Sequence, residues 1–300
     1  MEWHRDQVIL SKYGNITCIA ISPNNNFIAA STDNGVLLMF DPSNSNDIRS
    51  NQTHESAINQ ILWSKNGDYL ISCSNDKKIH LIDPQTLKNI ESFEGIDASI
   101  TCCDITPSCE LIAGADEIGR VYLWPTDSPE ACTIESPHQD VITSIHFLSS
   151  IYILTSSIDG LIRVFSTEKL ILLKTFSETF PISNACFSPV QKYITFSILD
   201  NRTFIVEKSS GKYVGEFKGY INMEYLLTPC FIDNRDLPNG TLEFIIPSED
   251  GRIISYDFKD QKQLWEFKPH DKSFNWSISQ NEELMASSEK DSNEIIIWKH

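Results

Sequence analysis

Short apolar runs separated by polar turns recur along the whole chain. Within residues 54–96, apolar-rich runs cover residues 57–63, 69–74, 79–82 and 87–93, and polar turns such as Lys65–Asp68 and Asn75–Lys78 separate them. Runs of this length between turn-forming residues are typical of β-strands. The inner runs are mostly apolar rather than alternating, which is typical of a sheet covered on both faces. This stretch therefore predicts one four-stranded sheet.

The same pattern repeats with a nearly constant period. The third run of each repeat ends at Phe40, Ile82, Trp124, Phe165, Val206, Tyr256 and Trp298, so that successive repeats are 42, 42, 41, 41, 50 and 42 residues apart. This period is that of one propeller blade. The sequence predicts an all-β, seven-bladed β-propeller that occupies residues 1–300 as one domain. The expected blades are residues 14–53, 54–96, 97–137, 138–178, 179–219, 220–269, and 270–300 together with strand 7–10.

The two ends of the chain predict how the last blade is completed. The seventh repeat has strand-like runs at residues 273–278, 284–288 and 294–298, without a fourth. Gln7–Leu10 is a strand-like run ahead of the first repeat, and we expect it to supply the missing strand, because an open sheet leaves unpaired backbone groups at its edge. The step of 50 residues arises from Asp233–Thr241, which we expect to form a surface loop.

An acidic residue stands six to eight positions before the end of each third run. We expect each acid in the turn between the second and third strands, where its carboxylate can accept backbone N–H bonds. The seven residues are Asp33, Asp76, Asp116, Asp159, Asp200, Asp250 and Asp291.

Three histidines stand at a fixed distance before three of these acids. His54, His138 and His270 precede Asp76, Asp159 and Asp291 by 22, 21 and 21 residues. A spacing that repeats favours a blade-stabilising His–Asp hydrogen bond over a ligand-binding or catalytic histidine.

Composition narrows the classes of function. The chain has 24 basic and 41 acidic residues and a net charge of −17. Such a charge repels phosphate backbones and attracts basic partners, although it also serves solubility. We therefore expect no direct binding of nucleic acid. No apolar run approaches the roughly 18 residues that span a bilayer, and the polar N-terminus differs from a secretory signal, so we expect an intracellular protein without membrane contact.

Motifs that carry chemistry are missing from the sequence. None of the eight cysteines belongs to a Cys-x-x-Cys pair, so metal-site spacing is absent. The phosphate-loop, dinucleotide-binding, hydrolase-elbow and zinc-protease motifs do not occur either. The sequence therefore predicts no enzyme, no cofactor and no metal site.

These landmarks resemble the tryptophan-aspartate (WD) repeat family over essentially the whole chain. The defining dipeptide is degraded, because Trp remains only at Trp124 and Trp298, and the following Asp only at Asp41, Asp83 and Asp257. The second half is most similar to the WD-repeat subunit of trithorax/COMPASS-type histone lysine methyltransferase complexes. The stretches that carry this similarity are residues 187–194, 199–201, 210–212, 222–225, 230–231, 248–250 and 287–298.

The resemblance implies a non-catalytic scaffold that binds other proteins. Its expected partners are methyltransferase complex subunits and basic histone tails, and its expected compartment is then the nucleus. A WD-repeat scaffold or adaptor of another assembly, in signalling, RNA processing or ubiquitin ligation, remains the alternative, and its compartment would be the cytoplasm.

The resemblance also implies a peptide site at the mouth of the central channel, where the related subunit clamps an arginine between aromatic rings. Tyr225 matches that site, and Asn59 lies at the position beneath the pocket. Thr228, Ile158 and either Asp116 or Glu117 replace the other pocket residues. Because guanidinium stacking needs aromatic faces, we expect no tight arginine binding there.

On the opposite face, the related subunit holds a partner segment between the fifth and sixth blades. Tyr193, Ile205 and Phe231 keep an apolar or aromatic character at the matching positions. Val190, Gly215 and Asp233 depart from the pattern. The resemblance implies partner contact through the first three residues, and ordinary packing between blades is the alternative for them.

Overall fold

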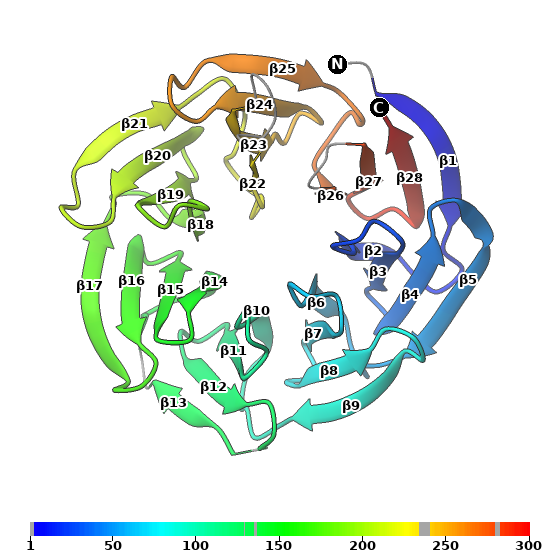
Figure 1. Ribbon diagram of the computed structural model, residues 1–300, viewed down its shortest axis with the longest axis horizontal. Helices are drawn as coiled ribbons and strands as arrows, with labels where there is room; N and C mark the ends of the chain where they lie inside the picture. The colour runs from blue at the N-terminus through cyan, green and yellow to red at the C-terminus, as the bar shows by residue number, and fades with distance from the viewer. Residues whose placement is uncertain (1–2, 129, 135–136, 234–240, 280–282) are drawn as a thin grey trace. The chain divides into compact units, whose positions relative to one another are not determined.

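A computed structural model describes residues 3–128, 130–134, 137–233, 241–279 and 283–300, without the side chains of residues 45 and 46. The regular structure of these residues consists of strands in seven four-stranded antiparallel sheets, with no helix among them (Figure 1). Six sheets use four strands that are consecutive in sequence, and the seventh joins the first strand to the last three. The sheets are the blades of an all-β, seven-bladed β-propeller, which confirms the predicted fold class.

The chain forms two compact units. One contains Glu2–Pro137 and Phe274–His300, and we refer to it as the terminal unit. The other contains His138–Ser273, and we refer to it as the central unit.

The terminal unit holds four of the sheets. Their strands are β1 (His4–Leu10), β2 (Ile16–Ile21), β3 (Ile28–Thr32), β4 (Val36–Asp41), β5 (Asn44–Gln52), β6 (Ile58–Trp63), β7 (Leu70–Ser74), β8 (Ile79–Asp83), β9 (Lys88–Phe93), β10 (Ile100–Ile105), β11 (Leu111–Asp116), β12 (Val121–Pro125), β13 (Cys132–Ile134), β26 (Phe274–Ile278), β27 (Leu284–Glu289) and β28 (Glu294–Lys299).

The central unit holds the other three sheets. Their strands are β14 (Ile142–Ser149), β15 (Tyr152–Ser157), β16 (Leu161–Ser166), β17 (Ile171–Ser177), β18 (Ile182–Phe187), β19 (Tyr193–Ile198), β20 (Arg202–Glu207), β21 (Tyr213–Phe217), β22 (Cys230–Asp233), β23 (Leu242–Pro247), β24 (Ile253–Asp257) and β25 (Gln263–Phe267).

Burial differs between the strands of one sheet as the hydrophobic pattern predicts. Every residue of β3 and β7 is buried, whereas the outer strands β9 and β17 are mostly exposed. The second strand of a blade has sheet on both sides and apolar neighbours on both faces. One detail differs from the prediction: Leu87 has a φ of 57° and belongs to the turn before β9 rather than to the strand, although its side chain is buried.

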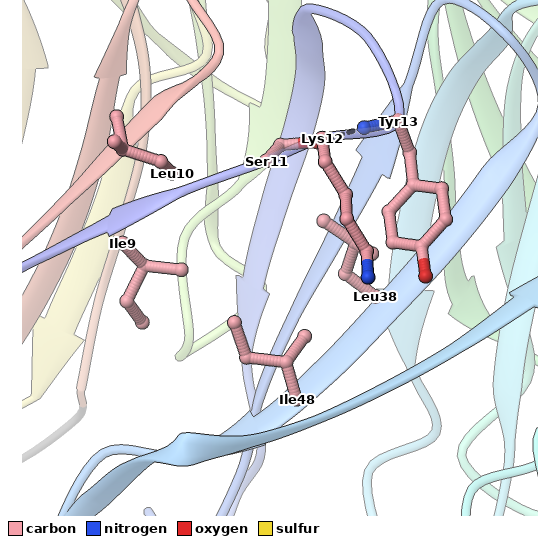
Figure 2. Close-up of a pocket in the computed structure, with 7 residues that line it drawn as sticks. All are labelled: Ile9, Leu10, Ser11, Lys12, Tyr13, Leu38 and Ile48. Atoms are coloured by element: carbon pink, nitrogen blue, oxygen red, sulfur yellow. Dashed lines mark hydrogen bonds between the residues drawn. The ribbon is translucent and has the colours of Figure 1, made fainter.

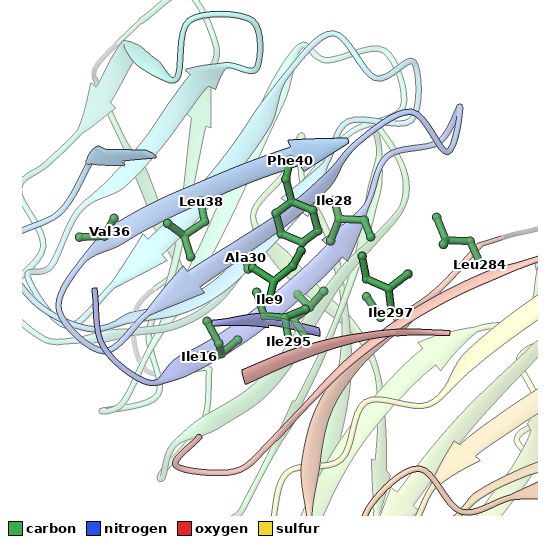
Figure 3. Close-up of a cluster of buried hydrophobic side chains, with 12 residues drawn as sticks. Ile9, Ile16, Ile28, Ala30, Val36, Leu38, Phe40, Leu284, Ile295 and Ile297 are labelled. Carbon is green, nitrogen blue, oxygen red and sulfur yellow. The ribbon is translucent and has the colours of Figure 1, made fainter. Parts of the chain in front are cut away.

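The N-terminal strand completes the last blade, as predicted. β1 pairs antiparallel with β28 from His4 to Leu10, so the strand begins three residues earlier than the predicted Gln7. Ile9 is only 4% exposed and belongs to the same buried cluster as Ile295, Ile297 and Ile28 (Figure 3). The pairing therefore contributes both backbone hydrogen bonds and a core side chain.

The expected surface loop and the expected absence of a membrane span can also be compared with the structure. Asn234–Gly240, the main part of the expected surface loop, lies outside the described residues. In the described part of the chain, no helix is long and apolar enough to cross a membrane.

Replacing Ile9 by Ala should lower the free energy of unfolding by about 2–5 kcal/mol, because it leaves a cavity in the cluster that joins β1 to the first blade. The matched control is Val8→Ala on the same strand, since Val8 is 39% exposed and should change stability by about 1 kcal/mol or less. Urea unfolding of both variants measures the difference. Equal losses would show that β1 does not anchor through Ile9.

Candidate docking site and turn network

Tyr193 and Phe231 meet through a third aromatic residue in the central unit. Tyr193 begins β19, Phe231 lies on β22, and Phe258 directly follows β24. The ring centroids of Tyr193 and Phe231 lie 5.7 and 5.2 Å from that of Phe258. These separations are within the range of favourable aromatic pairs. We call these three residues the aromatic cluster.

The aromatic cluster rests on the core between two blades. Phe231 also lies 4.7 Å from Phe244, centroid to centroid, and Phe244 is only 1% exposed. Ile205 is 2% exposed and belongs to this core, whereas Tyr193 and Phe231 are partly buried against it. Ile205 therefore lies beneath the rings, and its place in a docking surface is that of a support.

Charge borders the aromatic cluster on one side. The Lys192 ammonium lies 5.1 Å from the centre of the Tyr193 ring and 3.7 Å from the Glu207 carboxylate. Sequence reasoning missed Phe258, although an apolar residue directly after the third-strand ending Tyr256-Asp257 was a visible signal.

The two residues expected at the channel mouth lie in different units. Asn59, in the terminal unit, donates from its amide to the side-chain oxygen of Asn75 and to the backbone carbonyl of Ile100, both at 2.7 Å. Asp116 is fully buried, and its carboxylate accepts hydrogen bonds from the Arg120 N–H at 2.8 Å and the Tyr122 hydroxyl at 3.0 Å. Its oxygens are thus already engaged within their own blade.

Tyr225, in the central unit, belongs to a loop that is fixed by one carboxylate. Oε1 of Glu249 accepts hydrogen bonds from the backbone N–H groups of Met223, Glu224 and Tyr225 at 2.7, 2.7 and 2.9 Å. Met223, two residues before Tyr225 in this loop, has a side chain that is 52% exposed. Sequence analysis did not identify Glu249, because such a contact between residues about 25 positions apart leaves no local pattern.

Two of the predicted His–Asp pairs lie within single units, and in both the imidazole contacts the carboxylate. Nδ1 of His54 donates to Asp76 at 2.9 Å, and its Nε2 lies 2.8 Å from the Ser72 hydroxyl. His138 and Asp159 repeat this geometry at 3.0 Å, with Thr155 in the place of Ser72. The pair His270 and Asp291 remains a prediction.

The carboxylate of Asp76 also binds the backbone. It accepts hydrogen bonds from the N–H groups of Glu55 at 2.9 Å and Lys78 at 3.1 Å. Burial acts to raise the pKa of Asp76, but the bonds from His54 and from these N–H groups outweigh it and lower the pKa to about 2. Asp76 thus links the turn that contains it to the preceding loop.

Other turn acids have other partners. Asp33 accepts a hydrogen bond from the Asn15 N–H at 3.0 Å, Asp250 accepts one from Nε of Arg252 at 2.7 Å, and Asp200 is paired with Arg202. Six of the seven acids thus lie in turns, Asp116 ends strand β11, and the donor to the carboxylate varies among these blades.

A further histidine, His80, packs against His54 of the first pair with its ring tilted by 53°. Its ring centroid lies 4.1 Å from that of His54, its Nδ1 contacts the Asn89 amide, and its side chain is 5% exposed. Among the described residues its Nε2 has no hydrogen-bond partner. Burial, followed by the nearby His54, lowers the pKa of His80 to about 4.

Replacing Asp76 by Ala should destabilise the protein by about 1–3 kcal/mol, because His54 and two backbone N–H groups lose their acceptor. The control is Asp97→Ala, since the Asp97 side chain is 86% exposed and contacts Arg120 only at 3.4 Å, and surface pairs of this kind contribute at most about 1 kcal/mol. Chemical denaturation at neutral pH compares the two. A loss no greater than that of Asp97→Ala would contradict the structural role.

His80 should make stability depend on pH. Because its pKa is about 4 when folded and 6.5 when unfolded, the neutral form favours folding, and its contribution is complete above pH 6.5 and is lost as pH falls through 4. The loss should reach about 1–3 kcal/mol. Replacing His80 by Leu, the residue at the matching position 38, should flatten the dependence between pH 6.5 and 4. Urea midpoints at three pH values in that window test this, and parallel curves for parent and variant would contradict it.

Comparison with known proteins supports the repeat assignment. The family described as "WD domain, G-beta repeat" matches residues 7–41 and 45–83. The chain is 20% identical over 312 aligned positions to a WD repeat-containing protein WDS homolog of Arabidopsis thaliana, covering 97% of this chain and 57% of that protein. It is 19% identical to the WD repeat domain-containing protein 83 homolog of Dictyostelium discoideum, covering 88% of each.

The name of a third relative assigns that protein to a complex. The chain is 24% identical over 262 positions to the COMPASS component SWD3 of Saccharomyces cerevisiae, covering 83% of this chain and 82% of that protein. The first two relatives are named as WD-repeat proteins, and all three align with more than four fifths of this chain. The repeat period of about 42 residues and the four-stranded sheets agree with these similarities. Residues 7–41 and 45–83 therefore match WD40 repeats, and the chain as a whole is similar to WD-repeat proteins, with its strands arranged in seven propeller blades.

Proposed function

We propose that this protein is a non-catalytic scaffold subunit of a COMPASS-like histone lysine methyltransferase complex, with residues 1–300 acting as one propeller. The observation that carries the proposal is the match with the COMPASS component, which extends over 83% of this chain and 82% of that protein. Such coverage compares two chains nearly end to end, rather than one shared repeat. The nucleus is the compartment that follows from it.

The aromatic cluster is the docking site that suits this role. Its rings are held by contacts with buried Phe244 and with one another, so little side-chain freedom is lost when a partner binds. Tyr is one of the residue types enriched among binding hot spots, and Phe is enriched in protein interfaces. The partner would place an apolar segment over Tyr193 and Phe231, with Lys192 at the border to attract a carboxylate.

The channel mouth has a smaller part in the proposal. Asp116 is buried and already accepts hydrogen bonds from its own blade, and Thr228 offers no aromatic face. Basic histone tails would therefore be attracted through the net charge of −17, weakly and in a manner that salt screens over about 8 Å. The same charge is unfavourable for direct binding of nucleic acid.

The alternative is a scaffold or adaptor of another assembly, in signalling, RNA processing or ubiquitin ligation. It is favoured by the match with the Dictyostelium WD repeat domain-containing protein 83 homolog, which covers 88% of each chain.

The test uses two tyrosines at the same position in neighbouring blades. Tyr193 begins β19 and Tyr152 begins β15. Affinity purification of the tagged protein from native cells, followed by mass spectrometry, should recover a SET-domain methyltransferase with the parent and with Tyr152→Ala. Tyr193→Ala should reduce that recovery roughly tenfold, which corresponds to about 1.4 kcal/mol. The melting temperature of Tyr193→Ala should stay close to that of the control variant Tyr152→Ala.

Three outcomes contradict parts of the proposal. Recovery of splicing or kinase components instead of a methyltransferase supports the alternative scaffold. Undiminished methyltransferase recovery with Tyr193→Ala removes the aromatic cluster as the docking site. A large loss of melting temperature marks Tyr193 as a packing residue.

A further inference from the structure

A cavity of about 280 Å³ opens in the terminal unit between the end of β1 and the outer strand β5 (Figure 2). Its apolar lining includes Ile9 and Leu38, which are 4% and 1% exposed, and Ile48, which is 37% exposed. Pockets for small-molecule ligands usually measure about 300–1,000 Å³. A cavity just below that range has room for one or two side chains rather than for a whole cofactor.

Two hydrogen-bond donors stand at the rim of this cavity. The Lys12 ammonium lies 5.3 Å from the centre of the Tyr13 ring, and Figure 2 shows both side chains extending from the same loop. The Ser50 hydroxyl donates to the Tyr13 oxygen at 2.9 Å, which leaves the phenolic hydrogen available to an outside acceptor. The described residues that line the cavity include no carboxylate.

Comparison between repeats shows that the blade does not need Lys12 for its turn. Lys12 stands one 42-residue period before His54, and it precedes Asp33 by 21 residues, as His138 precedes Asp159. Those histidines are 2% exposed and bonded to Asp, whereas Lys12 lines the open cavity.

The turn of the first blade is held by the backbone instead. Asp33 accepts its hydrogen bond from the Asn15 N–H at 3.0 Å. Gly14, with a φ of 125°, permits this approach, because a Cβ there would lie 2.2 Å from the Asp33 carboxylate oxygen. A cation that has no part in this turn therefore stands beside an apolar cavity, in a protein of net charge −17.

We propose that this cavity docks an acidic peptide segment of a partner protein. One leucine-sized side chain enters between Ile9 and Ile48, and the carboxylate of a neighbouring Asp or Glu accepts hydrogen bonds from the Lys12 ammonium and the Tyr13 hydroxyl. Charge complementarity selects this occupant, because two donors at the rim without a carboxylate bind an anion, and charge-assisted bonds are the stronger kind. The site is independent of the aromatic cluster and of the proposed complex.

The test is a titration of the full chain, labelled at isoleucine methyl groups, with the peptide acetyl-Gly-Ser-Leu-Glu-Ser-Gly-amide. We expect saturable shifts of the Ile9 and Ile48 methyl signals. Two matched peptides, with Ser for Leu or Gln for Glu, should bind roughly tenfold more weakly or not at all. Parallel titrations use Lys12→Met, which removes the charge and keeps the stem, and Ile48→Asp.

The matched control variant is Ile90→Asp. Ile90 occupies the corresponding place on β9 one repeat later and is 51% exposed. Lys12→Met and Ile48→Asp should each weaken binding roughly tenfold, while Ile90→Asp should bind as the parent does. The proposal is overturned by the absence of saturable shifts at millimolar peptide. It is also overturned if Lys12→Met binds like the parent, or if Ile90→Asp loses as much affinity as Ile48→Asp.

Discussion

Pairing of the first strand with the last is the interaction on which the order of the terminal unit depends. A four-stranded blade with two apolar faces cannot bury them alone, so each blade needs neighbours and the last blade needs a fourth strand. β1 meets this need from the other end of the chain, through its pairing with β28. Because Ile9 shares a cluster with Ile28 and Ile297, the same strand also carries core packing into the first blade.

A second constraint acts at the turns. Six of the seven acids lie in turns and Asp116 ends strand β11. A carboxylate that loses contact with solvent needs hydrogen-bond donors around it. His54 and His138 supply the donor in two blades, Tyr122 and backbone N–H groups in a third, and arginine in others. The physical requirement is a donor rather than a particular residue. This freedom explains how the turns can form although only some of the acids have a histidine partner.

Because the strands and turns hold each blade, its exposed side chains can differ from one repeat to the next. We expect these exposed side chains to form the surfaces that bind partners. The aromatic cluster forms where residues of two blades meet above a buried core. The Lys12 cavity forms where the first turn is held by the Asn15 N–H, so that the residue at the histidine position is available for another task. In both places, side chains that differ from those at matching positions of other repeats stand on buried core residues. Such a surface is suited to binding a partner.

The sequence by itself determined the number of blades, the approximate strand limits of the second and seventh blades, the acids near the turns and the strand that completes the last blade. These features are periodic or lie at chain ends, and hydrogen bonding and alternation along one strand impose them locally. The tertiary structure alone decided that Phe258 joins Tyr193 to Phe231, that Ile205 lies beneath them, and that Glu249 fixes the loop of Tyr225. It also decided that His80 packs against His54 and that Lys12 borders a cavity. Such contacts join side chains of different strands and blades, where the packing of neighbouring sheets sets the distances and no pattern along the chain records them.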